Sequence, residues 1–371
     1  MDKIPITIIG VGLVGLAIAE ELSAKYKNVL AVEKNHTFGQ ETSSRAGEVI
    51  HSGMYYPPGL LKTVFCKEGN RLLYEICAER NLPHKKIGKL IVATGAEEID
   101  KLWNLKKRAE QNGINDLAFL TRKQIRTLEP QVKAETALFS PSTGIIDSHS
   151  LMRSFLIEAE GRGATIVFRS KVTGIQYDGA FYVVEINHGE YCFQTNILIN
   201  SSGLYADKVA ALLGIDIDEN GYRIKFSKGS FFSASPTPQL KHLVWPVSRK
   251  NAKYRGIHTT VDYSGAARFG PNWEYVSKIE YSVDDSQKQI FYESLSKYLP
   301  GIKMKSLNPL MGGIRPQLQG PGESYRDFVI KEETDLGYPG LINLIGIECP
   351  GLTDCIPIAR YVSSLVQARL G

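Results

Sequence analysis

The 371-residue sequence predicts an α/β fold in two interleaved parts, one built on a mostly parallel sheet and one on an antiparallel sheet. Three observations support this prediction. The first thirty-odd residues have the pattern strand, helix, strand; residues 224–281 are rich in β-branched and aromatic residues broken by Pro and Gly; and an apolar strand followed by a helix closes the chain. The length exceeds the usual size of one hydrophobic core, so two domains are expected.

The elements follow from residue periodicity. A β-branched run from Ile4 to Ile9 precedes a helical pattern through Leu16 and Leu22, and a second β run covers Val29 to Val32. Residues 37–58 contain many Ser, Gly and Pro residues and lack periodicity, so they are predicted to form a long loop of a kind that is often functional. Predicted helices cover residues 61–79, 97–112, a short stretch from 121 to before 130, 148–160, 285–299 and 356–368, and further strands cover 89–94, 164–168, 171–177, 181–187, 197–200 and 341–347.

The composition is that of a globular protein, with 43% hydrophobic and 22% charged residues. The net charge of +5 is spread without a dense basic run, which argues against nucleic-acid binding and is compatible with attraction of an anionic cofactor and substrate. Five widely spaced cysteines form no CxxC pair, so no metal site is predicted and a reducing cytoplasm is favoured. No segment reaches roughly twenty apolar residues, so any membrane contact would be peripheral.

The turn after the first strand carries a G-x-G-x-x-G motif. Its first glycine permits a tight turn, its second lets the backbone approach a pyrophosphate, and its third allows close helix packing. Glu33, at the end of the second strand, is placed to accept hydrogen bonds from ribose hydroxyls, and its charge argues against NADP. The motif predicts a Rossmann-like dinucleotide site but does not distinguish NAD from FAD. It consists of Gly10, Val11, Gly12, Leu13, Val14 and Gly15.

Several further motifs follow in a fixed order over nearly the whole chain. They are ETSSR at 41–45, VIHSGMYYPPG at 49–59, Lys62 and Cys66, NSSGLYAD at 200–207, Lys228-Gly229, GGIRP at 312–316 and CPGLT at 349–353. In this order they resemble the D-amino acid oxidase superfamily of FAD-dependent oxidoreductases, and within it the L-2-hydroxyglutarate dehydrogenase/oxidase family. The resemblance implies FAD as the cofactor.

The resemblance also implies which residues hold the flavin. Hydroxyls of Ser43 and Ser44, and backbone N–H groups at Gly351 to Thr353 before the last helix, can donate to the pyrophosphate and the ring. Together with the glycine motif and Glu33, the implied cofactor residues are Lys34, Thr42, Ser43, Ser44, Gly47, Glu48, Val49, Ile50, His51, Val172, Ser201, Ser202, Gly203, Leu204, Gly313, Arg315, Gly351, Leu352 and Thr353.

Two domains are predicted on this basis. A three-layer, Rossmann-like FAD-binding domain with a mostly parallel sheet comprises residues 1–85, 145–220 and 310–371. An interleaved α+β substrate domain with an antiparallel sheet comprises residues 86–144 and 221–309.

The sequence departs from the family pattern at two places near the expected flavin ring. Ala46-Gly47-Glu48 replaces a pair that is usually polar, and Cys349 stands where Ser commonly precedes Pro-Gly. A covalent flavin thioether at Cys349 is one reading, and a small buried thiol in place of Ser is the favoured one. Both departures bear on the substrate more than on the cofactor.

Oxidation of a 2-hydroxy acid requires a base for the hydroxyl proton and a hydride acceptor, which the resemblance identifies as flavin N5. His258 is the preferred base, because imidazole titrates in the useful range and the resemblance places its strand over the flavin; His51 is the competing candidate. The predicted carboxylate anchors are Arg315 and Lys228. Additional hydroxyl donors are expected from Tyr56 and Tyr254.

Three functions therefore compete. The first is a flavin oxidoreductase that converts an L-2-hydroxyglutarate-like acid to the 2-keto acid, with oxygen or a quinone as electron acceptor. The second is an amine or amino-acid oxidase, because the same fold serves both chemistries. The third is a flavin-binding protein without turnover. HExxH, G-x-S-x-G and P-loop motifs are absent from the sequence, which leaves other chemistries unsupported.

Overall fold

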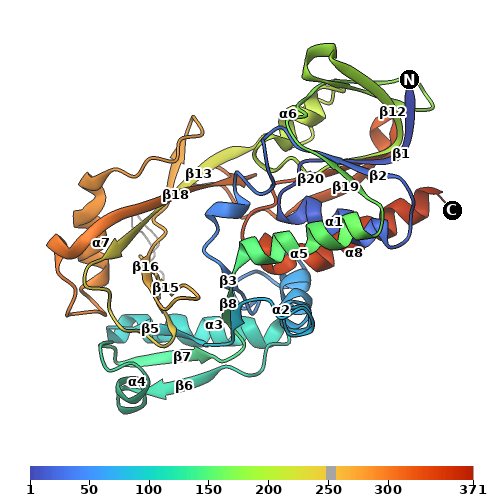
Figure 1. Ribbon diagram of the computed structural model, residues 1–371. Helices are drawn as coiled ribbons and strands as arrows, with labels where there is room; N and C mark the ends of the chain where they lie inside the picture. Colours follow the sequence, from blue (N-terminus) through green and yellow to red (C-terminus); the bar gives the residue numbers. More distant parts are fainter. Residues whose placement is uncertain (248–255, 371) are drawn as a thin grey trace. The chain divides into compact units, whose positions relative to one another are not determined.

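The computed structural model describes residues 1–247 and 256–370, and the chain divides into two compact units, each assembled from separate stretches (Figure 1). Unit 1 comprises Met1–Ser44, Ser148–Phe226 and Arg315–Gly371. Unit 2 comprises Arg45–Asp147 and Ser227–Ile314. Residues 45–85, predicted as part of the FAD-binding domain, thus belong to unit 2 by their packing, and the functional domain boundaries stay a prediction.

Unit 1 is built on an eight-stranded mixed sheet in the order β10-β11-β12-β1-β2-β9, with β20 beside β12 and β19 beside β20. The centre of this sheet is parallel: β1 pairs in parallel with β12 and β2, β2 with β9, and β12 with β20. Antiparallel pairing joins β10, β11 and β12, and also β19 and β20. The strands are β1 (Asp2–Ile9), β2 (Val29–Val32), β9 (Thr165–Val167), β10 (Val172–Tyr177), β11 (Tyr182–Ile186), β12 (Tyr191–Asn200), β19 (Val329–Glu333) and β20 (Tyr338–Ile345).

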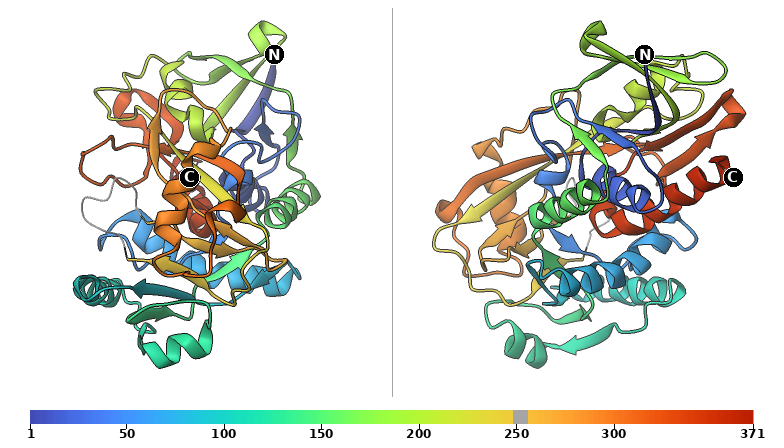
Figure 2. Two further views of the ribbon diagram at one scale, coloured as in Figure 1. Left: turned by 90° about the vertical axis from the view of Figure 1, so that its left-hand side faces the viewer. Right: turned by 45° about the vertical axis from the view of Figure 1, so that its right-hand side comes forward.

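Three helices cover one face of this sheet: α1 (Leu13–Ser23) packs against both α5 (Ser148–Gly161) and α8 (Gly351–Leu370), as Figure 2 shows on its right. The short helix α6 (Ala206–Ala211) packs with the β10-β11 hairpin in a second hydrophobic cluster, which contains Ile9 and Leu198 from the central strands. The sheet therefore has packed layers on both faces, as the sequence predicted for a Rossmann-like domain.

Unit 2 is built on a nine-stranded sheet in the order β17-β13-β16-β15-β14-β5-β7-β6, with β18 beside β13. The sequence predicted an antiparallel sheet, and most pairs are antiparallel, but β14 and β5 pair in parallel. The strands are β5 (Lys89–Ala93), β6 (Ala118–Thr121), β7 (Thr136–Ser140), β13 (Lys225–Ala234), β14 (Leu243–Pro246), β15 (Thr259–Val261), β16 (Ala267–Phe269), β17 (Glu274–Val276) and β18 (Leu307–Gln317).

Among its described residues, unit 2 also contains a small antiparallel sheet and four α-helices. The small sheet has the order β3-β8-β4, and its strand β3 lies within residues 37–58, which were predicted to form a loop. The predicted helix over residues 61–79 is confirmed to the residue. The elements are β3 (Val49–Ile50), β4 (His84–Lys85), β8 (Gly144–Ile146), α2 (Leu61–Glu79), α3 (Ile99–Gln111), α4 (Arg122–Leu128) and α7 (Lys288–Leu295).

Candidate functional site

The glycine motif forms the turn between β1 and α1 in unit 1. Gly10 has φ +98°, and a Cβ there would lie 2.6 Å from the carbonyl oxygen of Ser201, at the end of β12. A Cβ on Gly15 would lie 2.0 Å from the carbonyl oxygen of Gly10. Side chains are therefore excluded at both positions, and the backbone can bring the first turn of α1 close to a bound phosphate.

Glu33 fixes this turn to the end of β2. Its side chain is buried, and Oε2 accepts a hydrogen bond from the backbone N–H of Val11 at 2.9 Å. Oε1 accepts from the backbone and side-chain nitrogens of Asn35 at 2.9 and 2.8 Å. A carboxylate oxygen has two lone pairs, so Oε2 retains capacity for a ribose hydroxyl. The structure thus gives Glu33 a positioning role beside the predicted ribose contact.

The serine pair lies in the turn that follows. Ser43 Oγ accepts from the N–H of Leu13 at 3.0 Å, so this hydroxyl caps the first turn of α1 from thirty residues away. Ser44 Oγ donates to the carbonyl of Glu41 at 3.2 Å. Thr42, which precedes Ser43 in the chain, is half-buried. The Ser43 hydroxyl proton remains available for a phosphate or ring oxygen.

Lys34 is held by an acid and an aromatic ring. Its Nζ lies 2.5 Å from Glu41 Oε1 and 4.2 Å from the ring centroid of Tyr205. Burial alone would lower the pKa of Lys34, but Glu41 and Tyr205 raise it above its ordinary value. The ammonium group of Lys34 therefore stays charged, close to the end of β2 where Glu33 lies.

A buried polar chain fixes the end of β12 in unit 1. Asn200 Nδ2 donates to Asn343 Oδ1 and to the carbonyl of Ala206, both at 2.8 Å, and its Oδ1 accepts from Ser202 Oγ at 2.6 Å. Asn343 in turn donates to Glu333 Oε1 at 2.9 Å. The predicted residues Ser201 to Leu204 follow directly, so this chain sets their backbone path. The sequence motif included Asn200, but the partners from β19 and β20 gave no local signal.

The last helix begins earlier than predicted. The helical pattern indicated a start at Ile356, whereas α8 starts at Gly351 and includes Pro357. Thr353, Cys355 and Ile358 are all fully buried, so packing outweighs the cost of an internal proline. Gly351 to Thr353 therefore form the first helical turn; the N–H of Gly351 donates to the carbonyl of Glu348, and the positive end of the helix dipole suits an anionic ligand.

The remaining cofactor residues divide between the units. Val172 begins β10 and Arg315 lies half-buried on β18, both in unit 1. Gly313 belongs to unit 2, where a Cβ would lie 2.8 Å from the carbonyl oxygen of Arg45. A Cβ on Gly47 would meet nothing within 4 Å. The predicted unit 2 members are Gly47, Glu48, Val49, Ile50, His51 and Gly313.

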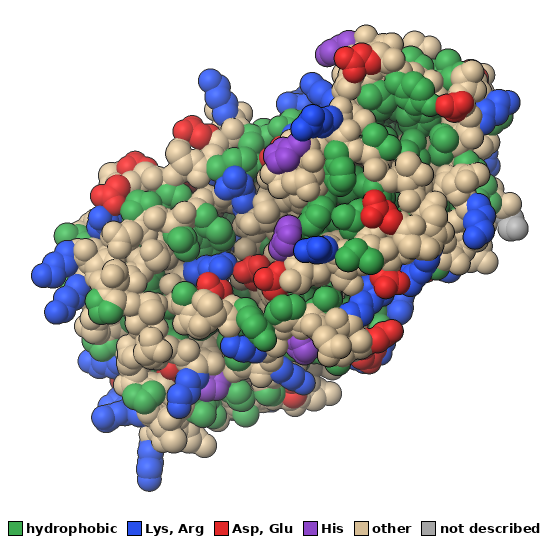
Figure 3. Space-filling model, in the orientation of Figure 1, with side chains coloured by type: hydrophobic (Ala, Val, Ile, Leu, Met, Phe, Trp, Pro, Cys, Tyr) green, Lys and Arg blue, Asp and Glu red, His purple; other side chains and the backbone are tan. Residues whose placement is uncertain are grey.

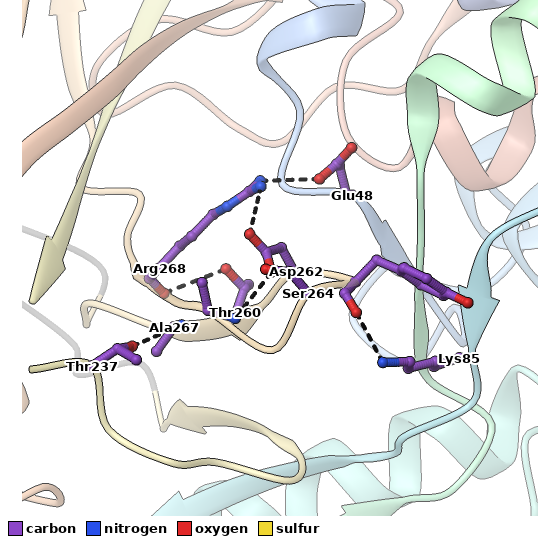
Figure 4. A network of polar contacts seen from close by, with 10 residues as sticks. Glu48, Lys85, Thr237, Thr260, Asp262, Ser264, Ala267 and Arg268 are labelled. Atoms are coloured by element: carbon purple, nitrogen blue, oxygen red, sulfur yellow. Dashed lines mark hydrogen bonds and ion pairs between the residues drawn. The ribbon is translucent and has the colours of Figure 1, made fainter.

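Glu48 is anchored to the sheet of unit 2 by an arginine (Figure 4). Arg268 Nη1 lies 3.0 Å from Glu48 Oε2, and Nη2 lies 3.1 Å from Asp262 Oδ2. Burial alone would raise the pKa of Asp262, but donors from Ser264, Ala266 and Arg268 hold it below its ordinary value. Glu48 has φ +56°, so its backbone conformation needs this support. Sequence reasoning found Glu48 and missed Arg268 and Asp262.

The two candidate bases meet at one indole in unit 2. His258, just before β15, stacks on Trp245 with ring centroids 3.9 Å apart and planes 5° apart. His51, just after β3, approaches the same ring edge-on at 5.7 Å and 71°. The structure therefore brings together two histidines that are separated by 207 positions in the numbering. Trp245 was missed, because an aromatic residue in an apolar run is most often core.

The other predicted substrate residues are dispersed. Lys228 lies half-buried on β13 of unit 2. Hydrogen bonds from Ser286 are the main cause that lowers the pKa of Asp284, and the charge of Lys228 lowers it further. Arg315 belongs to unit 1, so the two proposed anchors lie on different units. Tyr56 is half-buried in unit 2. Tyr254 lies outside the described residues.

The surface gives no sign of a single-sign electrostatic patch on the face drawn in Figure 3, where basic and acidic side chains are interspersed among the described residues. None of the helices in the described part of the chain combines the length and apolar character that crossing a membrane requires.

Comparisons with known proteins agree with this architecture. The family model described as FAD dependent oxidoreductase matches residues 5–365. The mitochondrial L-2-hydroxyglutarate dehydrogenase of Arabidopsis thaliana is 37% identical over 98% of this chain and 83% of its own, and L-2-hydroxyglutarate dehydrogenase of Escherichia coli K12 is 27% identical over 98% and 93%. Reduced L-α-glycerophosphate oxidase from Mycoplasma pneumoniae with FAD bound superposes with a TM-score of 0.88 at 25% identity, covering 99% of this chain and 95% of its own. Glycine oxidase from Geobacillus kaustophilus gives a TM-score of 0.79 at 20% identity, covering 100% of this chain and 96% of its own. This likeness concerns the fold alone.

Proposed function

Because the chain belongs to the FAD-dependent oxidoreductase family, we propose that it oxidises the hydroxyl group of a small 2-hydroxy acid, L-2-hydroxyglutarate or a close analogue, to the 2-keto acid. The names of the L-2-hydroxyglutarate dehydrogenases that it resembles over 98% of its length support this substrate class. The structural observation that carries the proposal is the pair of imidazoles at Trp245, because removal of a hydroxyl proton needs a base with a pKa near neutrality.

FAD, when bound, supplies the hydride acceptor, and the residues of unit 1 fit it. The side-chain-free turn at Gly10 and Gly15 accepts a pyrophosphate, Glu33 faces the ribose position, and the first turn of α8 offers backbone donors. The open space beside Gly47 is a further place that a bulky group can fill. These roles are proposed from the geometry of each unit on its own.

In the proposed reaction, His258 accepts the proton of the substrate hydroxyl and His51 is the alternative acceptor. Arg315 and Lys228 hold carboxylates, since a guanidinium binds a carboxylate in a bidentate manner and an ammonium acts as a point charge. Tyr56 and Tyr254 donate hydroxyl hydrogen bonds. The electrons leave to oxygen or a quinone. The predicted cytoplasmic location stays a prediction, and several relatives are named mitochondrial.

The test is anaerobic titration of the purified holoenzyme. We expect L-2-hydroxyglutarate to abolish the visible absorbance of the oxidised flavin, with D-2-hydroxyglutarate as the matched control. A flavin that is reduced only by amines or amino acids would instead identify an amine oxidase. If light reduces the flavin but no hydroxy acid or amine of a test panel does, the protein is a non-catalytic flavoprotein. To identify the electron acceptor, turnover is measured in air with detection of peroxide, and separately with a soluble quinone.

A further inference from the structure

A lysine without exposed surface lies in unit 2, close to the two candidate bases. Lys89 is the first residue of β5, and its relative exposure is 0%. Lysine is almost never fully buried, because its ammonium loses hydration in the interior. The strand β5 lies between β14 and β7, so Lys89 is on an internal strand of the sheet.

Two aromatic rings receive the ammonium. Lys89 Nζ lies 4.1 Å from the ring centroid of Trp245 and 4.6 Å from that of Tyr55. The two rings stack on each other at 5.8 Å and 19°. Cation–π attraction is stronger at desolvated sites, so burial strengthens the attraction between this cation and both rings.

Strand register explains the contact. In the parallel pairing of β5 and β14, Lys89 lies opposite Leu243 and Ile91 lies opposite Trp245. Residues two apart on a strand share a face, so Lys89 and Trp245 are diagonal neighbours on the same face of the sheet. The register therefore places the two side chains within reach of each other.

Both candidate histidines contact the same indole, that of Trp245. His258 stacks on Trp245 almost in parallel, and His51 meets its edge. One ring thus contacts a buried cation and both imidazoles. A restraint on the indole orientation is also a restraint on the plane of the His258 imidazole.

We propose that Lys89 and Trp245 are positioning residues: the ammonium of Lys89 fixes the indole of Trp245, and the indole fixes the imidazole of His258 in the orientation that accepts the substrate proton. The proton-transfer part rests on the proposed function. The geometric part, in which the cation orders the indole and the indole orders the imidazole, is independent of it. Neither residue needs to touch the substrate for this role.

The test uses the full-length holoenzyme with Lys89→Met, which keeps the length of the side chain and removes its charge, and Lys89→Arg, which keeps the charge. We expect Lys89→Met to lower kcat roughly tenfold to a hundredfold, because misplaced catalytic groups cost rate in this range, with KM changed less than about twofold. Lys89→Arg should recover most of the loss. Trp245→Leu should lower kcat as Lys89→Met does, and Trp245→Phe should retain more activity.

Lys85→Met is the matched control. Lys85 Nζ also lies over an aromatic ring of unit 2, 4.5 Å from the centroid of Tyr263, and donates to the Tyr263 carbonyl at 2.8 Å, but it is exposed and does not contact either histidine ring. We expect its kcat, KM and flavin content to equal those of the wild type.

A spectroscopic readout separates positioning from the chemistry. The parallel indole should shift the His258 Cε1–H proton resonance upfield, and both Lys89→Met and Trp245→Leu should move it back while Lys85→Met leaves it in place. A Lys89→Met enzyme with wild-type kcat, or with an unmoved His258 resonance, would overturn the proposal. If no 2-hydroxy acid reduces the wild-type flavin, the proposed function fails, and the resonance shift still decides the geometric part.

Discussion

At the residue scale, the glycines of the nucleotide turn are the most strictly determined positions. We expect Gly15→Ala to destabilise the protein by about 1–3 kcal/mol, because its Cβ would lie 2.0 Å from the carbonyl oxygen of Gly10 and the helix would have to move. FAD content after purification should fall with it. Chemical unfolding and flavin absorbance measure both quantities.

The control for this substitution is Gly161→Ala at the end of α5, where a Cβ meets nothing within 4 Å. Its unfolding midpoint should equal or exceed that of the wild type, since alanine restricts the unfolded chain. Equal stability of Gly15→Ala and Gly161→Ala would contradict the packing argument.

Cys77, on α2, illustrates a pKa set by burial. Burial raises the pKa of its thiol to about 12, and Arg80 lowers it only in part. The thiolate is the reactive form, so at pH 8, about four units below this value, Cys77 should resist iodoacetamide in the native protein and react after unfolding. Peptide mass spectrometry measures the modification. Rapid labelling of Cys77 in the native state would show that α2 opens readily.

Sequence reasoning reached the residues whose signal is local. The glycine motif and Glu33 were recognisable because spacing along one strand-helix-strand unit defines them. Lys89 and Trp245 were not, because their contact depends on a parallel pairing between strands more than 150 positions apart, and an isolated lysine at the start of an apolar strand reads as a strand boundary. The pairing of His51 with His258 at one ring was likewise outside what spacing reveals.

At the element scale, the start of α4 was predicted correctly at Thr121. Thr121 caps α4 with a full capping box, in which its side chain accepts from the N–H of Gln124 and the Gln124 side chain accepts from the N–H of Thr121. We expect Thr121→Ala to cost about 1 kcal/mol of unfolding free energy, without a change in flavin content or KM. Thr127→Ala, on the exposed face of the same helix, is the control and should cost less.

The Glu48–Arg268–Asp262 network joins a loop to β16. Removal of this network should weaken the binding of the cofactor. We expect Arg268→Met to weaken FAD binding roughly tenfold, which corresponds to about 1.4 kcal/mol, because the loop at Glu48 loses a charged hydrogen bond. Fluorescence titration of apoprotein with FAD measures it. Arg122→Met, which breaks an exposed pair with Glu135, should bind FAD as the wild type does.

The same network predicts a pH dependence. Since the pKa of Asp262 is lowered in the folded state, its contribution to stability is present above the ordinary carboxyl pKa and is lost as pH falls through the lowered value. The stability difference between wild type and Arg268→Met should therefore be largest near neutral pH and shrink in acid. A difference that grows on acidification would contradict the assignment.

Element boundaries failed where tertiary packing overrode local preference. The helical pattern predicted a start at Ile356, yet α8 starts five residues earlier, at Gly351, because its buried face continues through Thr353. Strands β7, β8, β18 and β19 were not predicted, since each is short or mixed in composition and is stabilised by pairing with its neighbours in a sheet.

At the scale of the whole molecule, the interleaving of two α/β parts was predictable, but the crossing points were not. Ser44 and Arg45 belong to different units although they lie in one predicted loop. The mixed sheet of unit 2 was also missed, because the parallel pairing of β5 with β14 leaves no mark on the period-two pattern of either strand.

Cofactor binding should stabilise the whole protein. A ligand that binds only the folded state adds about 2.7 kcal/mol at a hundred times its dissociation constant, so saturating FAD should raise the unfolding temperature of the apoprotein by several degrees. Circular dichroism follows the transition. NAD at the same concentration is the control and should give no comparable rise; a larger rise with NAD would reassign the nucleotide turn.

The composition of unit 1 from three stretches sets an order of events during synthesis. Residues 45–314, which contain all of unit 2, precede β20 and α8 in the chain and therefore emerge from the ribosome before these last partners of β12 and α1. Until then the nascent first domain has an open sheet edge beside β12 and an uncovered helix face on α1. A translation stall before β20 and α8 have emerged would therefore expose apolar surface of the kind that chaperones and proteases recognise.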